Sequence, residues 1–148
     1  MKIITVNKKA FHNYDIKEKI EAGIQLTGDE VKSLRQGNVS LVDAFATIHK
    51  GEVNLLNCYI APYSHAYSKV DKTRRTRKLL LHKREINKLI GDVSRKGLTL
   101  IPLRMYFKKG FVKVELGLAK HKKAVSKKRE LREKDIKRQA EREVKYRR

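Results

Sequence analysis

The chain has 148 residues and 40% apolar content, enough for one compact domain with a short additional segment. Lys and Arg number 37 against 16 acidic residues, a formal net charge of +21; this excess opposes compaction unless a polyanion neutralises it, so we predict a nucleic acid as partner. Cys58 is the only cysteine, which excludes an intramolecular disulfide and is typical of a reducing cytoplasm. The sequence has neither a signal-peptide core nor a run of about 18 apolar residues, so we expect neither export nor a membrane span.

The first long element is predicted at residues 14–26. Apolar and polar side chains alternate there, and only Glu18 interrupts the apolar set, which indicates a strand with one solvated face. Glu21 is an acid on that face, surrounded by lysines. Its carboxylate either accepts a hydrogen bond from RNA or forms a cross-strand salt bridge with a lysine, and the sequence leaves both interpretations open.

A short basic helix is predicted directly after this strand. Thr27 and Glu30 have the spacing of a capping box, so the helix should begin after Thr27 and end at Gly37. Lys32 and Arg35 are three residues apart, so they should project together away from the buried side of the helix.

The middle of the chain favours a hairpin followed by an irregular segment. Residues 38–43 have loop composition, and the apolar runs at 44–49 and 53–60 indicate two strands joined around Lys50-Gly51-Glu52. Residues 61–76 contain a proline, several Ser and Tyr residues and no clear period, so we expect an irregular excursion there.

A second helix and a second hairpin follow. The apolar spacing from residue 83 to about 94 predicts an amphipathic helix, and Gly97 is placed to end it. Residues 98–107 and 111–118 alternate as two strands of a hairpin. Pro102 lacks a backbone donor, so it restricts the first of these strands to a sheet edge or a bulge.

The composition changes at Lys120. Residues 120–148 hold 14 Lys or Arg, 5 acids and hardly any large apolar side chain, so we expect a tail that is disordered when free. Its strong helix formers and Glu–Lys pairs four residues apart predict that it becomes helical on an RNA surface. Residues 1–119 should form a mainly β domain of five or six antiparallel strands with short helices. A closed or partly closed barrel of the OB kind is the expected architecture, and pattern alone leaves a sandwich open.

Basic residues from distant segments are expected to form one RNA-binding face. If six to ten of them meet phosphates together, affinity should fall by roughly three to five decades between about 50 and 200 mM salt. A set scattered over the surface is the alternative, since sequence separation does not show that these groups share a face. The set comprises Lys32, Arg35, Arg74, Arg75, Arg77, Lys78, Lys108, Lys109, Lys113, Lys120, Lys122 and Lys123. Rings that either stack on unpaired bases or pack in the core are Phe11, His12, Tyr14, Tyr59, Tyr63, Tyr67, Tyr106 and Phe107.

The sequence gives little support for catalysis. The carboxylates show no D-x-D pairing, the five histidines lack zinc spacing, and there is no Gly-rich phosphate loop. We therefore expect no metal, no cofactor and no enzymatic activity. A ribosomal or general RNA-binding module and a small nuclease remain as alternative functions.

Four separated strings carry a resemblance to a known family. In order and spacing, NKKAFHNYDI, EAGIQLTGDEVKSLRQG, RTRKLLLHKREI and FKKGFVKVELGLAKHKK resemble the small protein B family, the bacterial partners of transfer-messenger RNA. The resemblance runs from about Asn7 to the end and implies a six-stranded OB-fold barrel with three helices and no catalysis. It further implies a protein that binds the tRNA-like part of transfer-messenger RNA and stands in for its missing anticodon arm. The alanine-charged RNA is then brought, with elongation factor Tu, to 70S ribosomes stalled on messages without a stop codon.

The resemblance also implies residue roles. It places Glu21 on the RNA-contacting strand, and Lys32 and Arg35 on the basic helix. The family has a segment that lies along the RNA elbow, and the residues that match it here are Arg75, Arg77, Lys78, Leu80 and His82. The basic residues of the last hairpin that we expect to join this surface are Lys108, Lys113, Lys120, Lys122 and Lys123. The tail should enter the empty mRNA channel at the decoding centre and become helical there, through Lys127, Lys128, Lys134, Asp135, Lys137 and Arg138. Val125 and Ser126 stand where many members have an aromatic and an acid, and His121 is left open as a substitute. We expect a cytoplasmic monomer.

Overall fold

The computed structural model describes residues 1–63 and 71–122 of the chain. The strands are β1 (Lys2–Val6), β2 (Tyr14–Ile24), β3 (Val39–Ser40), β4 (Phe45–His49), β5 (Glu52–Leu56), β6 (Tyr59–Ile60), β7 (Arg77–Leu80), β8 (Thr99–Lys108) and β9 (Phe111–His121). The helices are α1 (Lys8–Asn13), α2 (Gly28–Arg35) and α3 (Lys83–Lys96).

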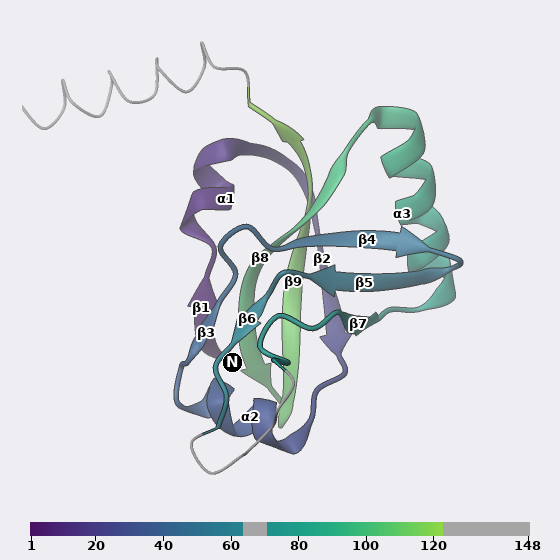
Figure 1. Cartoon of the computed structure of the whole chain (residues 1–148). Coiled ribbons are helices and arrows are strands. Elements are labelled where there is room, and N and C mark those ends of the chain that lie inside the picture. Colours follow the sequence, from purple (N-terminus) through teal and green to yellow (C-terminus); the bar gives the residue numbers. More distant parts are fainter. Residues whose placement is uncertain (64–70, 123–148) are drawn as a thin grey trace, which may run out of the picture.

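Six of the strands close into a ring. Their order is β8-β4-β5-β7-β2-β9, and β9 pairs back onto β8, while β1 adds to β8 from outside the ring. All of these pairings are antiparallel. The mainly β class and the six-stranded OB-like barrel are therefore confirmed, and the sandwich is excluded. Figure 1 shows α1 and α2 at opposite ends of this barrel and α3 beside it.

The predicted long strand is present as β2. It pairs with β9 from Tyr14 opposite His121 to Gly23 opposite Lys113. Its solvated face is exposed and Ala22 and Ile24 are buried, as the alternation predicted. The interruption at Glu18 coincides with a bulge, because the register shifts between Ile16 and Glu18.

Both hairpins turn through two residues. In the β4–β5 turn Lys50 and Gly51 have φ of 49° and 76°, and in the β8–β9 turn Lys109 and Gly110 have φ of 51° and 81°. Positive φ at both positions is the type I′ arrangement, whose twist matches that of the flanking strands. The turns are thus one residue shorter than predicted. Pro102 takes the bulge option, since the β8–β9 register shifts between it and Arg104.

The two predicted helices begin where local signals place them, and each ends two residues from its predicted end, α2 at Arg35 and α3 at Lys96. Thr27 and Glu30 form a reciprocal capping box at the start of α2, and Gly37 follows its end with φ of 75°. The helix α3 runs to Lys96, two residues beyond the predicted end, and Gly97 closes it in the left-handed region at φ of 62°.

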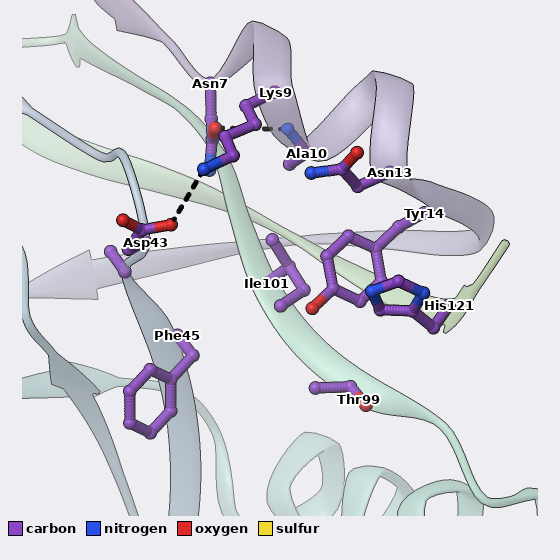
Figure 2. A pocket seen from close by; sticks show the side chains of 11 residues that line it. Asn7, Lys9, Ala10, Asn13, Tyr14, Asp43, Phe45, Thr99, Ile101 and His121 are labelled. Atoms are coloured by element: carbon purple, nitrogen blue, oxygen red, sulfur yellow. Dashed lines mark hydrogen bonds and ion pairs between the residues drawn. The ribbon is translucent and has the colours of Figure 1, made fainter. Parts of the chain in front are cut away.

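The sequence pattern did not place helix α1, although the resemblance implied a third helix, and one buried side chain anchors it (Figure 2). The Asn7 side-chain oxygen accepts from the Ala10 backbone N–H at 3.2 Å and so caps the helix. The Asn7 amide nitrogen donates to the carbonyls of Leu41 and Pro102 at 3.2 and 3.0 Å. Asn7 therefore joins the start of α1 to two other segments of the barrel.

The apolar interior is divided into two clusters. The larger fills the barrel between the ring strands. The smaller lies under α1 on the outer face of β8 and β9, where Ala10 meets Ile101, Leu103 and Ala119. Gly117 allows this close packing, because a Cβ there would lie 2.9 Å from a methyl carbon of the fully buried Leu103.

Other boundaries differ from the predicted ones. Residues 38–43 include the short strand β3, and the predicted strand at 53–60 is divided into β5 and β6 by Asn57, whose φ is 60°. Residues 61–63 and 71–76 are irregular as expected. Strand β9 continues to His121, two residues past the expected limit of the barrel. Residues 64–70 and the predicted tail from 123 onward lie outside the described residues. Within the described part of the chain, no helix has the length and apolarity needed to cross a membrane.

Candidate nucleic-acid interface

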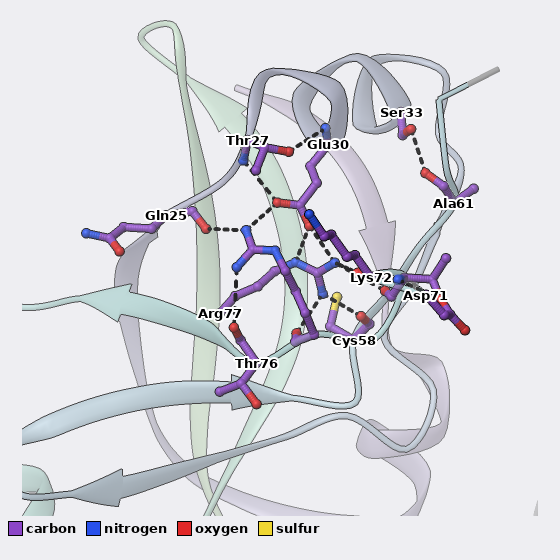
Figure 3. A network of polar contacts seen from close by, with 12 residues as sticks. Gln25, Thr27, Glu30, Ser33, Cys58, Ala61, Asp71, Lys72, Thr76 and Arg77 are labelled. Atoms are coloured by element: carbon purple, nitrogen blue, oxygen red, sulfur yellow. Dashed lines mark hydrogen bonds and ion pairs between the residues drawn. The ribbon is translucent and has the colours of Figure 1, made fainter. Parts of the chain in front are cut away.

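A buried ion pair holds the segment before β7 against α2 (Figure 3). The Glu30 carboxylate accepts from Arg77 Nε at 2.6 Å, from the guanidinium of Arg75, and from the Thr27 backbone N–H at 3.0 Å. Arg77 is fully buried and donates to the Cys58 carbonyl at 2.7 Å. Its remaining N–H groups bond the carbonyls of Lys72, Thr73 and Arg75. The guanidinium of Arg77 thus fixes the loop that leads into β7.

This arrangement changes the assignment of two predicted RNA contacts. Arg77 has no exposed side-chain surface, so its role in the structure is to position the loop rather than to meet RNA. Arg75 keeps 31% of its side chain exposed while it pairs with Glu30. Burial alone would raise the pKa of Glu30, but the bonds from Arg75, Thr27 and Arg77 outweigh burial and hold that pKa below its usual value. Glu30 is therefore an anion at neutral pH.

Glu21, Tyr106 and Lys108 meet on the outer face of β2, β8 and β9. The Tyr106 hydroxyl donates to Glu21 Oε2 at 2.5 Å, and Lys108 Nζ lies 3.3 Å from the same oxygen. The hydrogen bond from Tyr106 is the main cause that lowers the pKa of Glu21. The lysine salt bridge that the sequence left open is thus present, and it leaves Glu21 Oε1 without a hydrogen bond among the described residues.

An apolar side chain lies beside this charged group. Leu80 of β7 and Lys113 of β9 flank Gly23 of β2, because both are register partners of that glycine. A Cβ on Gly23 would lie 3.2 Å from the Cβ of Leu80, so the glycine lets Leu80 approach β2 closely. Leu80 remains 47% exposed, and the exposed His82 follows it as the N-cap residue of α3. We call Glu21, Leu80, His82, Lys108 and Lys113 the RNA-facing surface, a name that states the sequence-based expectation that these residues contact RNA.

Of the two predicted cations of α2, Arg35 lies next to the β8–β9 turn, whereas the Nζ of Lys32 lies 5.0 Å from the ring centroid of Tyr63. Lys32 and Arg35 are both exposed. Arg35 lines a hollow of about 530 Å³ together with Lys2 and the aromatic rings of Phe107 and Phe111. Arg35 is thereby placed against the tip of the hairpin that carries Lys108.

The predicted basic residues of β9 lie toward the two ends of the β2–β9 ribbon. Lys113 pairs opposite Gly23, whereas Lys120 pairs opposite Asp15 near the other end of the ribbon. Seven residues of extended strand separate the two lysines by roughly 20 Å. Lys120 and Lys122 therefore lie at the α1 end of the barrel, away from the RNA-facing surface.

The other predicted site residues have separate positions. Lys78 is exposed on β7, where its Nζ lies 3.4 Å from a carboxylate oxygen of Glu52. The predicted residues outside the described ranges are Lys123, Lys127, Lys128, Lys134, Asp135, Lys137 and Arg138.

Sequence reasoning missed two features next to the RNA-facing surface, the exposed ring of Phe111 and the hydrogen bond from Tyr106 to Glu21. Phe111 is 68% exposed at the hairpin tip. The sequence held a signal for this, because Phe111 lies two residues before Lys113 and so on the same solvated face of β9. The role of Tyr106 as a donor to Glu21 had no local signal, because the two residues are 85 positions apart. Among residues 1–63 and 71–122, no group of three or more His, Cys, Asp or Glu side chains is placed to hold a metal ion.

Comparisons with known proteins bear on what this surface binds. The family model described as SmpB protein matches residues 4–146. The SsrA-binding protein of Sulfurihydrogenibium sp. (strain YO3AOP1) is 56% identical over 144 residues, covering 97% of this chain and 95% of the relative. The SsrA-binding protein of Geobacillus thermodenitrificans (strain NG80-2) is 52% identical over 141 residues, covering 95% and 91%. A chain of the solved structure described as "tmRNA-SmpB: a journey to the center of the bacterial ribosome" is similar with a TM-score of 0.67 and 54% identity, covering 81% of this chain and 85% of that chain.

Proposed function

This chain belongs to the SmpB protein family, and from that premise we propose that it is an RNA-binding adaptor for transfer-messenger RNA. It binds the tRNA-like domain of that RNA and delivers it to stalled ribosomes for trans-translation and nascent-chain tagging. The observation that carries this conclusion is the sequence identity of 52–56% to two SsrA-binding proteins over nearly the whole chain. The similarity to a chain from a tmRNA–SmpB structure supports the ribosome as the place of action.

The RNA-facing surface offers three kinds of contact to a folded RNA. Lys108 and Lys113 supply cations for phosphates. The exposed Leu80 supplies an apolar face for a sugar or base. Glu21 Oε1 is an acceptor for a base amino group or a ribose 2′-hydroxyl, and its carboxylate is held in place by Tyr106. Such a mixed surface recognises RNA shape and hydroxyls as well as charge.

Further parts of the proposal concern partners and the C-terminal segment. The protein acts as a monomer in the cytoplasm, performs no catalysis itself, and meets elongation factor Tu through the bound RNA. The basic segment from residue 123 onward enters the mRNA channel of the small subunit and contacts its ribosomal RNA there. The positive charge of that segment supports this role.

Binding specificity is the first test. In filter-binding titrations at roughly physiological salt, the full-length protein should prefer transfer-messenger RNA to bulk tRNA by at least about tenfold. Equal affinity for the two RNAs would contradict the proposal and indicate a general RNA-binding module.

Two lysine variants test the surface itself. Lys113→Ala should weaken binding and reduce the slope of log affinity against log salt by about 1. Lys96→Ala, at the far end of α3, is the matched control and should leave the slope unchanged (Figure 1). The same slope for Lys113→Ala as for wild type would remove this lysine from the interface.

A truncation separates RNA binding from action on the ribosome. The cut belongs after Lys122, because β9 extends to His121 and the Lys122 N–H donates to the Asn13 carbonyl at 3.0 Å. A cut after Ala119 would remove residues that pair with Tyr14 and Asp15. The shortened protein should bind transfer-messenger RNA within about twofold of wild type, because residue 122 lies at the opposite end of β9 from Lys113. It should nevertheless fail to support tagging. Tagging that survives the cut would refute the proposed role of the C-terminal segment.

A further inference from the structure

Helix α3 has one side that faces away from the barrel. Figure 1 shows the helix at the edge of the molecule, standing beside the barrel. Its inner side is fixed by Leu89, which is 2% exposed, and by Ile86 and Val93, which pack against the larger apolar cluster. Gly91 follows Leu89 by two residues, a rotation of about 200° at 3.6 residues per turn. Gly91 therefore lies on the outward side of α3, opposite the buried side.

The fold of the free protein does not explain Gly91. The residue lies inside α3, which runs to Lys96 and is closed by Gly97 in the left-handed region. Gly91 itself has no positive φ, and a Cβ there would have no other heavy atom within 4 Å. Neither backbone geometry nor internal packing requires a glycine, which destabilises a helix interior relative to alanine. A partner that approaches the helix backbone closely would require one.

Cations surround Gly91 on the same side of the helix. Steps of four, three and four residues, the spacing of one helix face, connect Arg84, Lys88, Gly91 and Arg95, which we call the outer face of α3. All three cations are exposed. Lys88 pairs with Glu18 of β2, whereas the side chains of Arg84 and Arg95 form no hydrogen bond or ion pair among the described residues. At 1.5 Å per residue the outer face is roughly 16 Å long, so it can meet several phosphates of one strand.

The acidic residues of α3 are engaged elsewhere. Glu85 accepts from the His82 backbone N–H at 3.1 Å at the start of the helix. The Asp92 side chain is only 14% exposed, and one of its oxygens lies 3.6 Å from Lys96 Nζ. The outer face therefore presents positive charge without an exposed carboxylate of its own helix.

The chemistry of this side of α3 favours RNA over a protein partner. Asn87 and Ser94, four residues before and three after Gly91, are exposed and add hydrogen-bond donors beside the cations. Ile90 is the one large apolar side chain of α3 that is exposed, at 39%, whereas the centre of a protein–protein interface is usually rich in apolar and aromatic residues. His82, the N-cap residue of α3, belongs to the RNA-facing surface, so the outer face begins beside that surface and extends away from it.

We propose that the outer face of α3 docks against the phosphate backbone of a folded RNA, with Gly91 at the point of closest approach. The cations that pair with its phosphates are Arg84, Lys88 and Arg95, and Lys88 exchanges Glu18 for a phosphate. The inference rests on the proposed function only in taking RNA as the partner. Two RNAs present the same backbone: transfer-messenger RNA, and the ribosomal RNA of a stalled ribosome.

Substitution of Gly91 in the full-length protein is the direct test. Gly91→Ala and Gly91→Gln should each raise the Tm of the free protein by about 2–4 °C, because each replaces a glycine inside a helix. The same variants should weaken binding by about threefold for Ala and tenfold or more for Gln, because the new side chain separates the helix from the RNA backbone. Binding is measured to transfer-messenger RNA on filters, and to stalled ribosomes by co-sedimentation of the complex with that RNA. A purely structural role of Gly91 would not combine higher stability with weaker binding.

Two results of this experiment would overturn the inference. The first is binding of Gly91→Gln to both partners within about twofold of wild type. The second is a Tm of Gly91→Ala below that of wild type, which would show that the fold itself requires the glycine.

Charge variants supply the second arm. Arg84→Gln combined with Arg95→Gln should reduce the slope of log affinity against log salt by about 2 for the RNA that docks here, one for each lost phosphate contact. Lys96→Gln is the matched control, because it removes a cation from the same helix that pairs with Asp92 and lies off the outer face. Its slope should equal that of wild type. A double variant with the wild-type slope for both partners would overturn the inference.

A cleavage experiment distinguishes the partners. Weaker binding of Gly91→Gln to transfer-messenger RNA would identify that RNA, and weaker binding to stalled ribosomes alone would identify a ribosomal component. An iron chelate on Lys96→Cys, beside the outer face, would then generate hydroxyl radicals that cut nearby RNA, while the fully buried Cys58 stays unlabelled. Cleavage of ribosomal RNA would support the inference, whereas lost ribosome binding without cleavage of any RNA would indicate a protein partner and overturn it. Failure of the wild-type protein to bind transfer-messenger RNA would refute the proposed function, and the ribosome assay would then decide this inference alone.

Discussion

Replacement of Glu30 by Gln should destabilise the barrel far more than an ordinary loss of surface charge. The substitution keeps the size of the side chain and removes its negative charge. Arg77 would then hold a guanidinium with no exposed surface and no counter-ion, since Glu30 is its only carboxylate partner among the described residues. A buried charge left without its partner costs several kcal/mol.

The structure allows the size of this effect to be estimated. The side chains of Glu30 and Arg77 are 12% and 0% exposed, so solvent screens the pair only weakly. Loss of one partner of such a pair costs about 3–5 kcal/mol. A domain of this size has a total stability of roughly 5–15 kcal/mol, so the variant should lose about a third of it. The corresponding decrease in Tm is roughly 10–20 °C.

Urea denaturation followed by circular dichroism measures the change. Glu18→Gln is the matched control, because Glu18 pairs with Lys88 on an exposed surface and its loss should cost about 1 kcal/mol or less. An unfolding free energy of Glu30→Gln within about 1 kcal/mol of the wild-type value would refute the account of the buried pair. The double variant Glu30→Gln with Arg77→Met should lose less unfolding free energy than the two single variants lose together, because it removes the buried guanidinium along with its partner.

The same pair predicts a pH dependence. The pKa of Glu30 is lower in the folded protein than in the unfolded chain. Its stabilising contribution is therefore complete above the unfolded pKa of about 4.3 and is lost as pH falls through the folded pKa. The stability difference between wild type and Glu30→Gln should decrease as the solution is acidified below about pH 4. A constant difference across this range would contradict the assigned pKa direction.

Three further predictions concern other parts of the barrel. Gly117→Ala should cost about 1–3 kcal/mol in chemical denaturation, because the new Cβ would overlap the buried side chain of Leu103. Tyr106→Phe should raise the pKa of Glu21 toward its usual value in a carbon-detected NMR titration, because the hydroxyl is the main group that lowers it. The Cys58 thiol should resist thiol reagents at about pH 8, because burial raises its pKa to about 11 and leaves no exposed surface.

Controls for these three predictions come from the same chain. Gly28→Ala places a Cβ where no atom lies within 4 Å, so its stability should equal or slightly exceed that of wild type. A loss equal to that of Gly117→Ala would contradict the packing argument. Tyr14→Phe should leave the pKa of Glu21 unchanged. Cys58 should react at the ordinary rate in denaturant, and an equal rate in the folded protein would show that the thiol is accessible.

Elements with strong local signals could be predicted from the sequence. The capping box of Thr27 and Glu30 depends on residues three positions apart. The two hairpins were also predicted from short Gly-containing segments between alternating strands, although each turn is one residue shorter than predicted. The alternation in β2 and β9 follows directly from burial of one face. These features are set within a few residues, so the local pattern was sufficient.

Features that depend on distant partners were missed. Arg77 lies in a basic run that resembles a phosphate-binding segment, and its carboxylate partner is 47 residues earlier. Glu30 was recognised as a capping residue, but nothing local shows that it also neutralises a buried guanidinium. Helix α1 has only six residues, and its cap on Asn7 is stabilised by carbonyls far along the chain. The distance between Lys113 and Lys120 likewise follows from the length of β9, which the charge pattern alone could not show.

The ring closure has a consequence for how the chain matures during its own synthesis. Strand β2 leaves the ribosome early, yet its long partner β9 ends only at His121. Until then both β2 and β8 present unpaired edges, which attract other extended chains. A copy terminated anywhere before β9 can never complete the barrel and stays exposed to proteases and aggregation. Premature truncation therefore eliminates the whole fold instead of yielding a shorter working protein.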